Sequence, residues 1–173
     1  MMETQAIKVG VVMQRLPLNN RWQSHQWRPF EIVKGDVLPV GGARCLRDAE
    51  DDTRWLFGNF EIRLFADEAE GYFLNINADH PCWFIMWRIE QIDGLDVAVP
   101  KSVTLSYNEA ARLMDGGEQV DNLPLSIELI ERIAAFTSDN YHPEPKRKRK
   151  KPSFEGGAGV DKMARAEGKP DGR

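Results

Sequence analysis

The chain has 173 residues, of which 42% are hydrophobic and 29% charged, and its formal net charge is −4 at pH 7. This length and composition fit one globular domain that buries its own core. No uninterrupted run of about 18 apolar residues occurs, which excludes a membrane-spanning helix. The first residues lack the basic, apolar and cleavage regions of a secretory signal, so we expect a cytoplasmic protein. Only two cysteines occur, Cys45 and Cys82, and we expect both to be free thiols.

The charge is unevenly distributed along the chain. Residues 146–173 hold ten Lys/Arg and four Asp/Glu, whereas residues 1–145 hold 13 Lys/Arg and 23 Asp/Glu. The local balances are therefore +6 and −10. An acidic body argues against the whole domain being a nucleic-acid platform, because phosphate contacts need cations clustered on a folded face.

The first half of the chain reads mainly as β-strands. Residues 6–16 are dense in β-branched side chains and predict a strand. Residues 26–34 predict a second one, in which Pro29 favours a sheet edge or a bulge because it lacks an amide donor. Residues 35–52 are rich in glycine and acidic residues and predict a long loop.

Alternating apolar positions then predict a hairpin. Residues 60–64 and 72–76 both alternate, and the sequence DEAEG between them predicts a turn. Residues 82–89 are almost entirely apolar, which favours a central strand, and a further strand over 96–105 follows the turn signal Asp93-Gly94. The count is six or seven strands.

Helical signals appear only after these strands. Ser106 and Glu109 have the spacing of a capping box and predict a helix over 107–115. A second helix is expected to begin at Pro124, with the core-facing stripe Ile127, Ile130, Ile133, Ala134 and Phe136. The order predicts an α+β fold: an antiparallel six- or seven-stranded curled sheet, barrel- or sandwich-like, closed by two C-terminal helices. We expect a single globular domain over 1–142 and a disordered basic tail over 143–173.

The tail contains the strongest compositional feature, an uninterrupted run of six cations. Such a run attracts phosphate backbones or acidic protein surfaces, but without interleaved aromatic residues it offers no stacking platform for bases. A solvated tail, an acidic protein partner and nucleic acid remain as interpretations of this run, and nucleic acid is the least favoured of the three. The run consists of Lys146, Arg147, Lys148, Arg149, Lys150 and Lys151.

Five tryptophans are many for this length, and three of them adjoin an arginine. Neighbouring strand residues point to opposite faces, so an arginine beside a buried tryptophan is expected on the solvated face. If those arginines share one face, they form a cationic patch able to bind a carboxylate or phosphate; scattered surface salt bridges are the alternative. The partner-binding candidates in the domain are Arg15, Trp22, Trp27, Arg28, Arg54 and Arg88.

The chain shows no complete catalytic or metal-binding signature. His80 and Cys82 form only one closely spaced ligand pair, so no metal is expected. The glycines of PVGGARCLR do not stand between a parallel strand and a helix, which argues against a nucleotide loop. Ser24 and His25 are sequence neighbours and so rarely face each other on a strand. We therefore expect no cofactor, and we favour a protein that is not an enzyme.

Several motifs resemble a bacterial domain family of unknown function. They are GVVMQR, the residues Asn20, Trp22, Trp27, Arg28 and Pro29, and SYNEAARLMDGGEQVDNLPLS followed by PEPKRKRKK. The resemblance covers about 1–151. Genes of the family commonly lie beside those of molybdenum-dependent formate dehydrogenase.

The resemblance implies a cytoplasmic accessory protein for the expression, maturation or assembly of formate dehydrogenase. It supplies no catalytic residues. Our leading hypothesis is a non-catalytic binding protein whose partner is formate dehydrogenase or one of its maturation factors. One alternative is a small enzyme or carrier for an anionic molybdopterin-type cofactor, and another is nucleic-acid binding by the tail.

Overall fold

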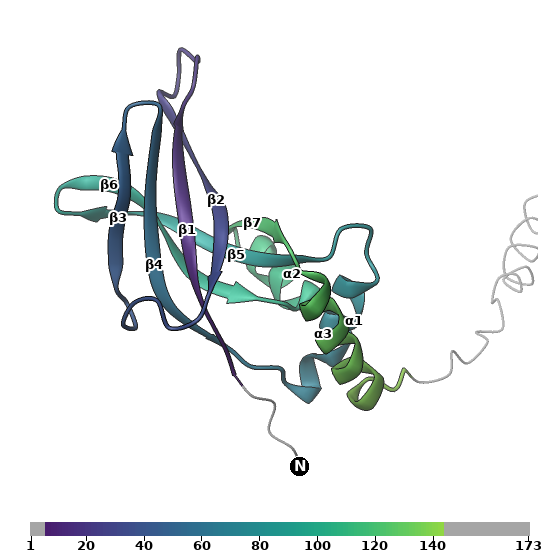
Figure 1. Ribbon diagram of the computed structural model, residues 1–173. Helices are drawn as coiled ribbons and strands as arrows, with labels where there is room; N and C mark the ends of the chain where they lie inside the picture. The colour runs from purple at the N-terminus through teal and green to yellow at the C-terminus, as the bar shows by residue number, and fades with distance from the viewer. Residues whose placement is uncertain (1–5, 144–173) are drawn as a thin grey trace, which may run out of the picture. The chain divides into compact units, whose positions relative to one another are not determined.

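The structure is a computed structural model that describes residues 6–143. Its described strands form two separate antiparallel sheets (Figure 1). The first has the order β2-β1-β4-β3 and consists of β1 (Ile7–Pro17), β2 (His25–Lys34), β3 (Ala43–Ala49) and β4 (Asp52–Ile62). The second has the order β6-β5-β7 and consists of β5 (Cys82–Ile92), β6 (Leu95–Thr104) and β7 (Gln119–Pro124).

The predicted α+β class is confirmed, and the seven strands agree with the expected count. The single curled sheet is wrong, because the segment between β4 and β5 is helical and does not continue the first sheet. It contains the 3₁₀ turn η1 (Ala66–Glu68) and the helix α1 (Ala69–Ile76). The predicted hairpin partner over 72–76 is therefore wrong as well.

Helix α1 shows why the alternating pattern misled. Tyr72, Leu74 and Ile76 are two residues apart, but Ala69, Tyr72 and Asn75 are three apart and lie buried on one helical face, while Leu74 is exposed. The Asn75 side chain donates to the carbonyls of Cys82 (2.8 Å) and Leu105 (2.9 Å) and accepts from the Cys82 amide (3.1 Å). These bonds to the start of β5 and the end of β6 require the helix.

Two of the strands, β3 and β7, were not predicted from the sequence. β3 lies inside the predicted loop over 35–52. Its polar composition is tolerated because it is an edge strand that is exposed along most of its length. β7 precedes the last helix, and Pro124 closes that strand instead of opening the helix. The helix α3 (Ile127–Asn140) begins after Ser126, whose Oγ accepts from the Leu129 amide.

The other helix agrees with its prediction. α2 (Tyr107–Asp115) begins after Ser106, whose Oγ accepts a hydrogen bond from the Glu109 amide at 3.1 Å. The return half of the capping box is absent, since the Glu109 carboxylate instead accepts from the hydroxyl of Thr104 at 2.8 Å.

The core lies between the inner faces of the two sheets and the helices α1 and α3. In Figure 1 the strands of the second sheet run across behind those of the first. α3 contributes Leu129, Ile133 and Thr137 as its buried residues, so the predicted stripe is shifted, and Ile127 is 75% exposed. Residues of the core include Val9, Val11, Met13, Phe57, Tyr72, Trp83, Ile85 and Val97.

In the part of the chain that the structure describes, no helix is long and apolar enough to cross a membrane.

Candidate functional site

A row of polar side chains crosses the outer face of the first sheet. Gln14 on β1 pairs directly with Arg28 on β2 and with Arg54 on β4, and Arg54 pairs in turn with Arg47 on β3. Directly paired residues point to the same face of a sheet. Three arginines and one glutamine, one from each strand, therefore form a continuous line, which we call the arginine row.

One carboxylate joins the members of the row. Asp52 begins β4 and lies two residues before Arg54, so both point to the same face. Its Oδ1 accepts from Gln14 Nε2 at 3.0 Å and from Arg54 Nε at 3.1 Å; its Oδ2 lies 2.7 Å from Arg54 Nη2 and 3.4 Å from Arg47 Nε. These hydrogen bonds, above all from Arg54 and then from Gln14, hold the pKa of Asp52 below its usual value, against the opposing effect of burial.

Gln14 connects the fourth member to this carboxylate. It is only 4% exposed, accepts from Arg28 Nε at 3.0 Å and donates from its own amide nitrogen to Asp52. Like charges directly opposite each other on neighbouring strands destabilise a sheet. The negative charge of Asp52 and the neutral side chain of Gln14 offset that repulsion, so the row is compatible with a stable sheet.

An aromatic residue and a shallow hollow adjoin the row. The Arg54 guanidinium lies 4.3 Å from the ring centroid of Phe30, a cation–π contact. Arg28 and Phe30 also line a hollow of about 410 Å³ where the edge of β2 faces β7. Its other lining residues are Pro29, Asp121, Asn122 and Leu123.

The four arginines expected on one face do not share it. Arg28 and Arg54 do, but Arg15 follows Gln14 and points to the opposite face, where its Nη2 donates to Thr53 Oγ1 at 3.2 Å. Arg88 belongs to the second sheet and pairs with Glu118 through two hydrogen bonds. The adjacency to tryptophan was a poor guide because it ignored the register between strands.

Sequence reasoning missed the other members of the site. Arg47 lay in a predicted loop, Gln14 was noted only as part of the motif GVVMQR, and Asp52 belongs to no motif. A strand assignment for 43–49 would have revealed Arg47, but the pairing with Arg54 depends on a bulge between Cys45 and Arg47, which the sequence does not announce.

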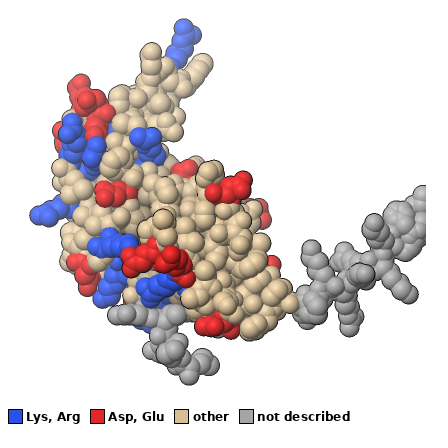
Figure 2. Space-filling view, turned by 45° about the vertical axis from the view of Figure 1, so that its right-hand side comes forward, with Lys and Arg blue, Asp and Glu red and all other residues tan. Residues whose placement is uncertain are grey.

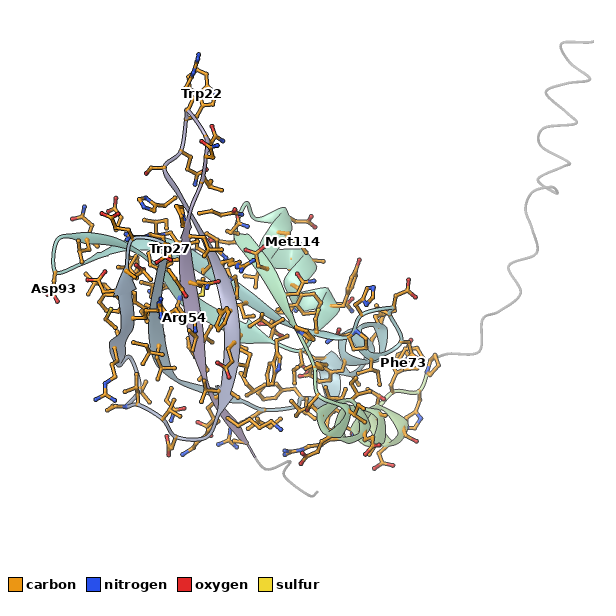
Figure 3. All side chains as sticks on the ribbon, turned by 45° about the horizontal axis from the view of Figure 1, so that its top comes forward. Trp22, Trp27, Arg54, Phe73, Asp93 and Met114 are labelled. Carbon is orange, nitrogen blue, oxygen red and sulfur yellow. The ribbon has the colours of Figure 1, made fainter. Side chains whose placement is uncertain are left out.

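Trp22 lies at the end of a projecting hairpin. The pairs Leu16↔Gln26 and Pro17↔His25 close the ladder between β1 and β2, and the residues between them continue past the sheet. We call residues 16–26 the arm. Figure 3 shows Trp22 at its end, beyond the labelled Trp27 and Arg54. Trp22 is 87% exposed, whereas Trp27 is partly buried against the core.

The tip of the arm is held by its own hydrogen bonds. The Trp22 amide donates to Asn20 Oδ1 at 2.9 Å, and the Leu18 amide donates to the Ser24 carbonyl at 2.9 Å. Between Glu3 and Glu31 the sequence contains no acidic residue, while it contains Lys8, Arg15, Arg21 and Arg28. In Figure 2 the arm carries blue atoms at its end and no visible red ones.

The remaining predicted features give no site in the described part. Ser24 Oγ and His25 Nδ1 lie 2.9 Å apart on the exposed arm, and no carboxylate within residues 6–143 bonds to either of them. In that range no group of three or more His, Cys, Asp or Glu is placed to hold a metal ion. Cys45 and Cys82 are both free thiols. The cation run over 146–151 lies outside the described residues.

Comparison of the sequence with known protein families identifies the family of this chain. A family model described as "Protein of unknown function (DUF3305)" matches residues 8–150. The chain belongs to this family. The DUF3305 match includes the arm, the arginine row and the first five cations of the run. No curated protein and no solved structure matches the DUF3305 chain.

Proposed function

We propose that this protein is a non-catalytic accessory protein that binds a protein partner through its arm. The partner that the family resemblance implies is formate dehydrogenase or one of its maturation factors. The observation that carries the proposal is the indole of Trp22, which is 87% exposed at the end of the arm.

Trp22 has the properties of a binding residue. Tryptophan is enriched among the few residues that dominate binding free energy at protein interfaces. Its side chain offers about 200 Å² of mostly apolar surface with few rotatable bonds. Because the Asn20 and Ser24 hydrogen bonds fix the backbone around it, little conformational entropy is lost when a partner covers it.

The charge of the arm indicates which chemical groups its partner presents. Residues 6–143 hold 13 Lys/Arg and 21 Asp/Glu, yet the arm has Arg21 beside Trp22 and no acid. We infer a partner with an apolar recess for the indole and carboxylates on its rim. Complementary rim charges mainly raise the association rate, and burial of the indole lowers the dissociation rate.

The test compares two exposed apolar positions. The full chain is used to capture proteins from cells grown with formate, and binding of the identified partner is then measured with purified proteins by calorimetry. Trp22→Ala should weaken that binding at least ten-fold, since a central aromatic residue contributes about 2 kcal/mol or more. Ile127→Ala, at a 75% exposed position on α3, is the matched control and should leave it unchanged.

Two results would contradict the proposal. One is the absence of formate dehydrogenase and of its maturation factors among the captured proteins. The other is equal affinity of Trp22→Ala and the unmodified chain for a purified partner.

A further inference from the structure

The arginine row has more positive charge than its surroundings neutralise. Arg47 and Arg54 share the single carboxylate of Asp52, and Arg28 bonds only to the neutral Gln14, which leaves an excess of two charges on the row. Among residues 6–143, Arg28 forms no ion pair within 4 Å. We propose that the row is a binding site for a phosphate group carried by a small organic molecule. This inference is independent of the arm and goes beyond the proposed function.

The donors that remain on the row suit a phosphate. Arg28 uses Nε on Gln14, which leaves both of its terminal nitrogens without a partner in the described residues. Arg54 uses Nε and Nη2 on Asp52, and Arg47 directs its Nε toward the same carboxylate. The outer nitrogens of the three guanidiniums are therefore left to bind an oxyanion, and guanidinium forks match phosphate oxygens in pairs.

Gln14 and Asp52 preorganise these donors. Each arginine that binds a ligand normally loses side-chain freedom. Here Gln14, at 4% exposure, holds Arg28 at its Nε, and Asp52 holds the other two. Arg54 is further confined by its contact with the Phe30 ring. The guanidiniums are fixed by side chains that the ligand does not need to displace.

The adjoining hollow accepts the rest of the molecule. Arg28 belongs both to the row and to the wall of the 410 Å³ hollow, and Phe30, which is 37% exposed, lines that hollow as well. Asp121 lines the hollow and accepts from Trp87 Nε1 at 2.7 Å. This carboxylate repels a second anionic group. The ligand class is therefore a phosphate monoester with a neutral, partly apolar remainder.

The experiment observes the arginines directly in the full chain. Inorganic phosphate and phenyl phosphate are titrated at constant ionic strength while the Nε–Hε resonances of the arginines are followed by NMR. Acetate is the monoanionic control, and a phosphoserine peptide tests a phosphorylated protein as the source. Because each resonance belongs to one residue, binding of phosphate by the lysine-rich tail does not enter the measurement.

We expect saturable shifts of Arg28, Arg47 and Arg54 with both phosphates, and tighter binding of phenyl phosphate than of inorganic phosphate. Arg28→Gln and Arg47→Gln should each weaken binding at least ten-fold. Arg47 lies on an exposed edge strand, so its replacement keeps the test valid if the other variant misfolds. Arg63→Gln, which removes an exposed ion pair with Glu61, should change the affinity less than two-fold.

Shifts that do not saturate, that acetate reproduces, or that survive both substitutions would overturn the site. Equal affinity for the two phosphates would overturn the role of the hollow. A phosphoserine peptide that binds more than ten-fold tighter than phenyl phosphate would overturn the small-molecule ligand. None of these outcomes depends on Trp22, so failure here is distinguishable from failure of the proposed function.

Discussion

Replacement of Asn75 tests whether one side chain joins α1 to the end of the second sheet at which β5 begins and β6 ends. Asn75 is 1% exposed and is the residue through which α1 binds the first residue of β5 and the residue after β6. Asn75→Leu keeps the number of side-chain heavy atoms and removes the three hydrogen bonds to backbone groups. The Cys82 amide then loses its acceptor, and the carbonyls of Cys82 and Leu105 each lose a donor.

The size of the effect follows from these three groups. A buried N–H without a partner costs about 1–3 kcal/mol, and each carbonyl bond contributes about 0.5–1.5 kcal/mol. The free energy of unfolding should therefore fall by about 2–6 kcal/mol, a large share of the roughly 5–15 kcal/mol typical of a domain. The control is Asn77→Ala, which removes one exposed bond to the Phe73 carbonyl and should cost at most about 1 kcal/mol.

The assay is urea unfolding followed by circular dichroism. Asn75→Asp adds a test of sign, because a carboxylate at this position faces two carbonyl oxygens in a buried site and its pKa is raised above the unfolded value of about 3.9. A raised folded-state pKa means that the folded form takes up the proton first, so the deficit relative to the unmodified chain should shrink as the pH falls from about 7 to 5. A loss under 1 kcal/mol for Asn75→Leu, or a pH-independent deficit for Asn75→Asp, would refute the reasoning.

Three further predictions concern the neighbouring junction and the thiols. Gly71→Ala should lower the free energy of unfolding by about 1–3 kcal/mol, since the added Cβ would collide with Ser106 Oγ; an unchanged urea midpoint would contradict this. The hydrogen bond from Ser106 holds the pKa of Glu68 below 4.5, so its contribution is present above that pH and is lost as the pH falls through the lowered pKa. Glu68→Gln should accordingly be less stable than the unmodified chain at pH 7 and should approach it in acid; parallel pH curves would exclude the contribution. Cys45 should react with a thiol reagent far faster than Cys82, which is buried and whose pKa burial raises; equal rates would contradict that burial.

Local signals predicted local structure well. Ser106 and Glu109 lie three residues apart, and the helix over 107–115 that they predicted is present with the same bounds. The helix over Ala69–Ile76 was missed because its alternating apolar residues fit a strand equally well. Its identity is decided by bonds from Asn75 to strands that lie up to 30 residues away. Such bonds leave no periodic trace in the sequence.

The arginine row illustrates the same limit at the candidate site. Arg28 and Arg54 were identified as candidates from their tryptophan neighbours, but whether they met depended on the register of β2, β1 and β4. Arg47 joins them only because a bulge in β3 shifts the pairing by one residue. Without a structure, a one-residue error in register moves every side chain of a strand to the other face.

The exposure of Trp22 means that binding, and not stability, constrains which residue occupies this position. An indole that contributes almost nothing to the core can be exchanged for another side chain at little cost in stability, so substitutions at the tip of the arm can follow changes in a partner freely. The tryptophan at position 83, which is buried, has no such freedom. Retention of Trp22 among related chains would therefore reflect binding, whereas retention of the buried tryptophan would reflect stability.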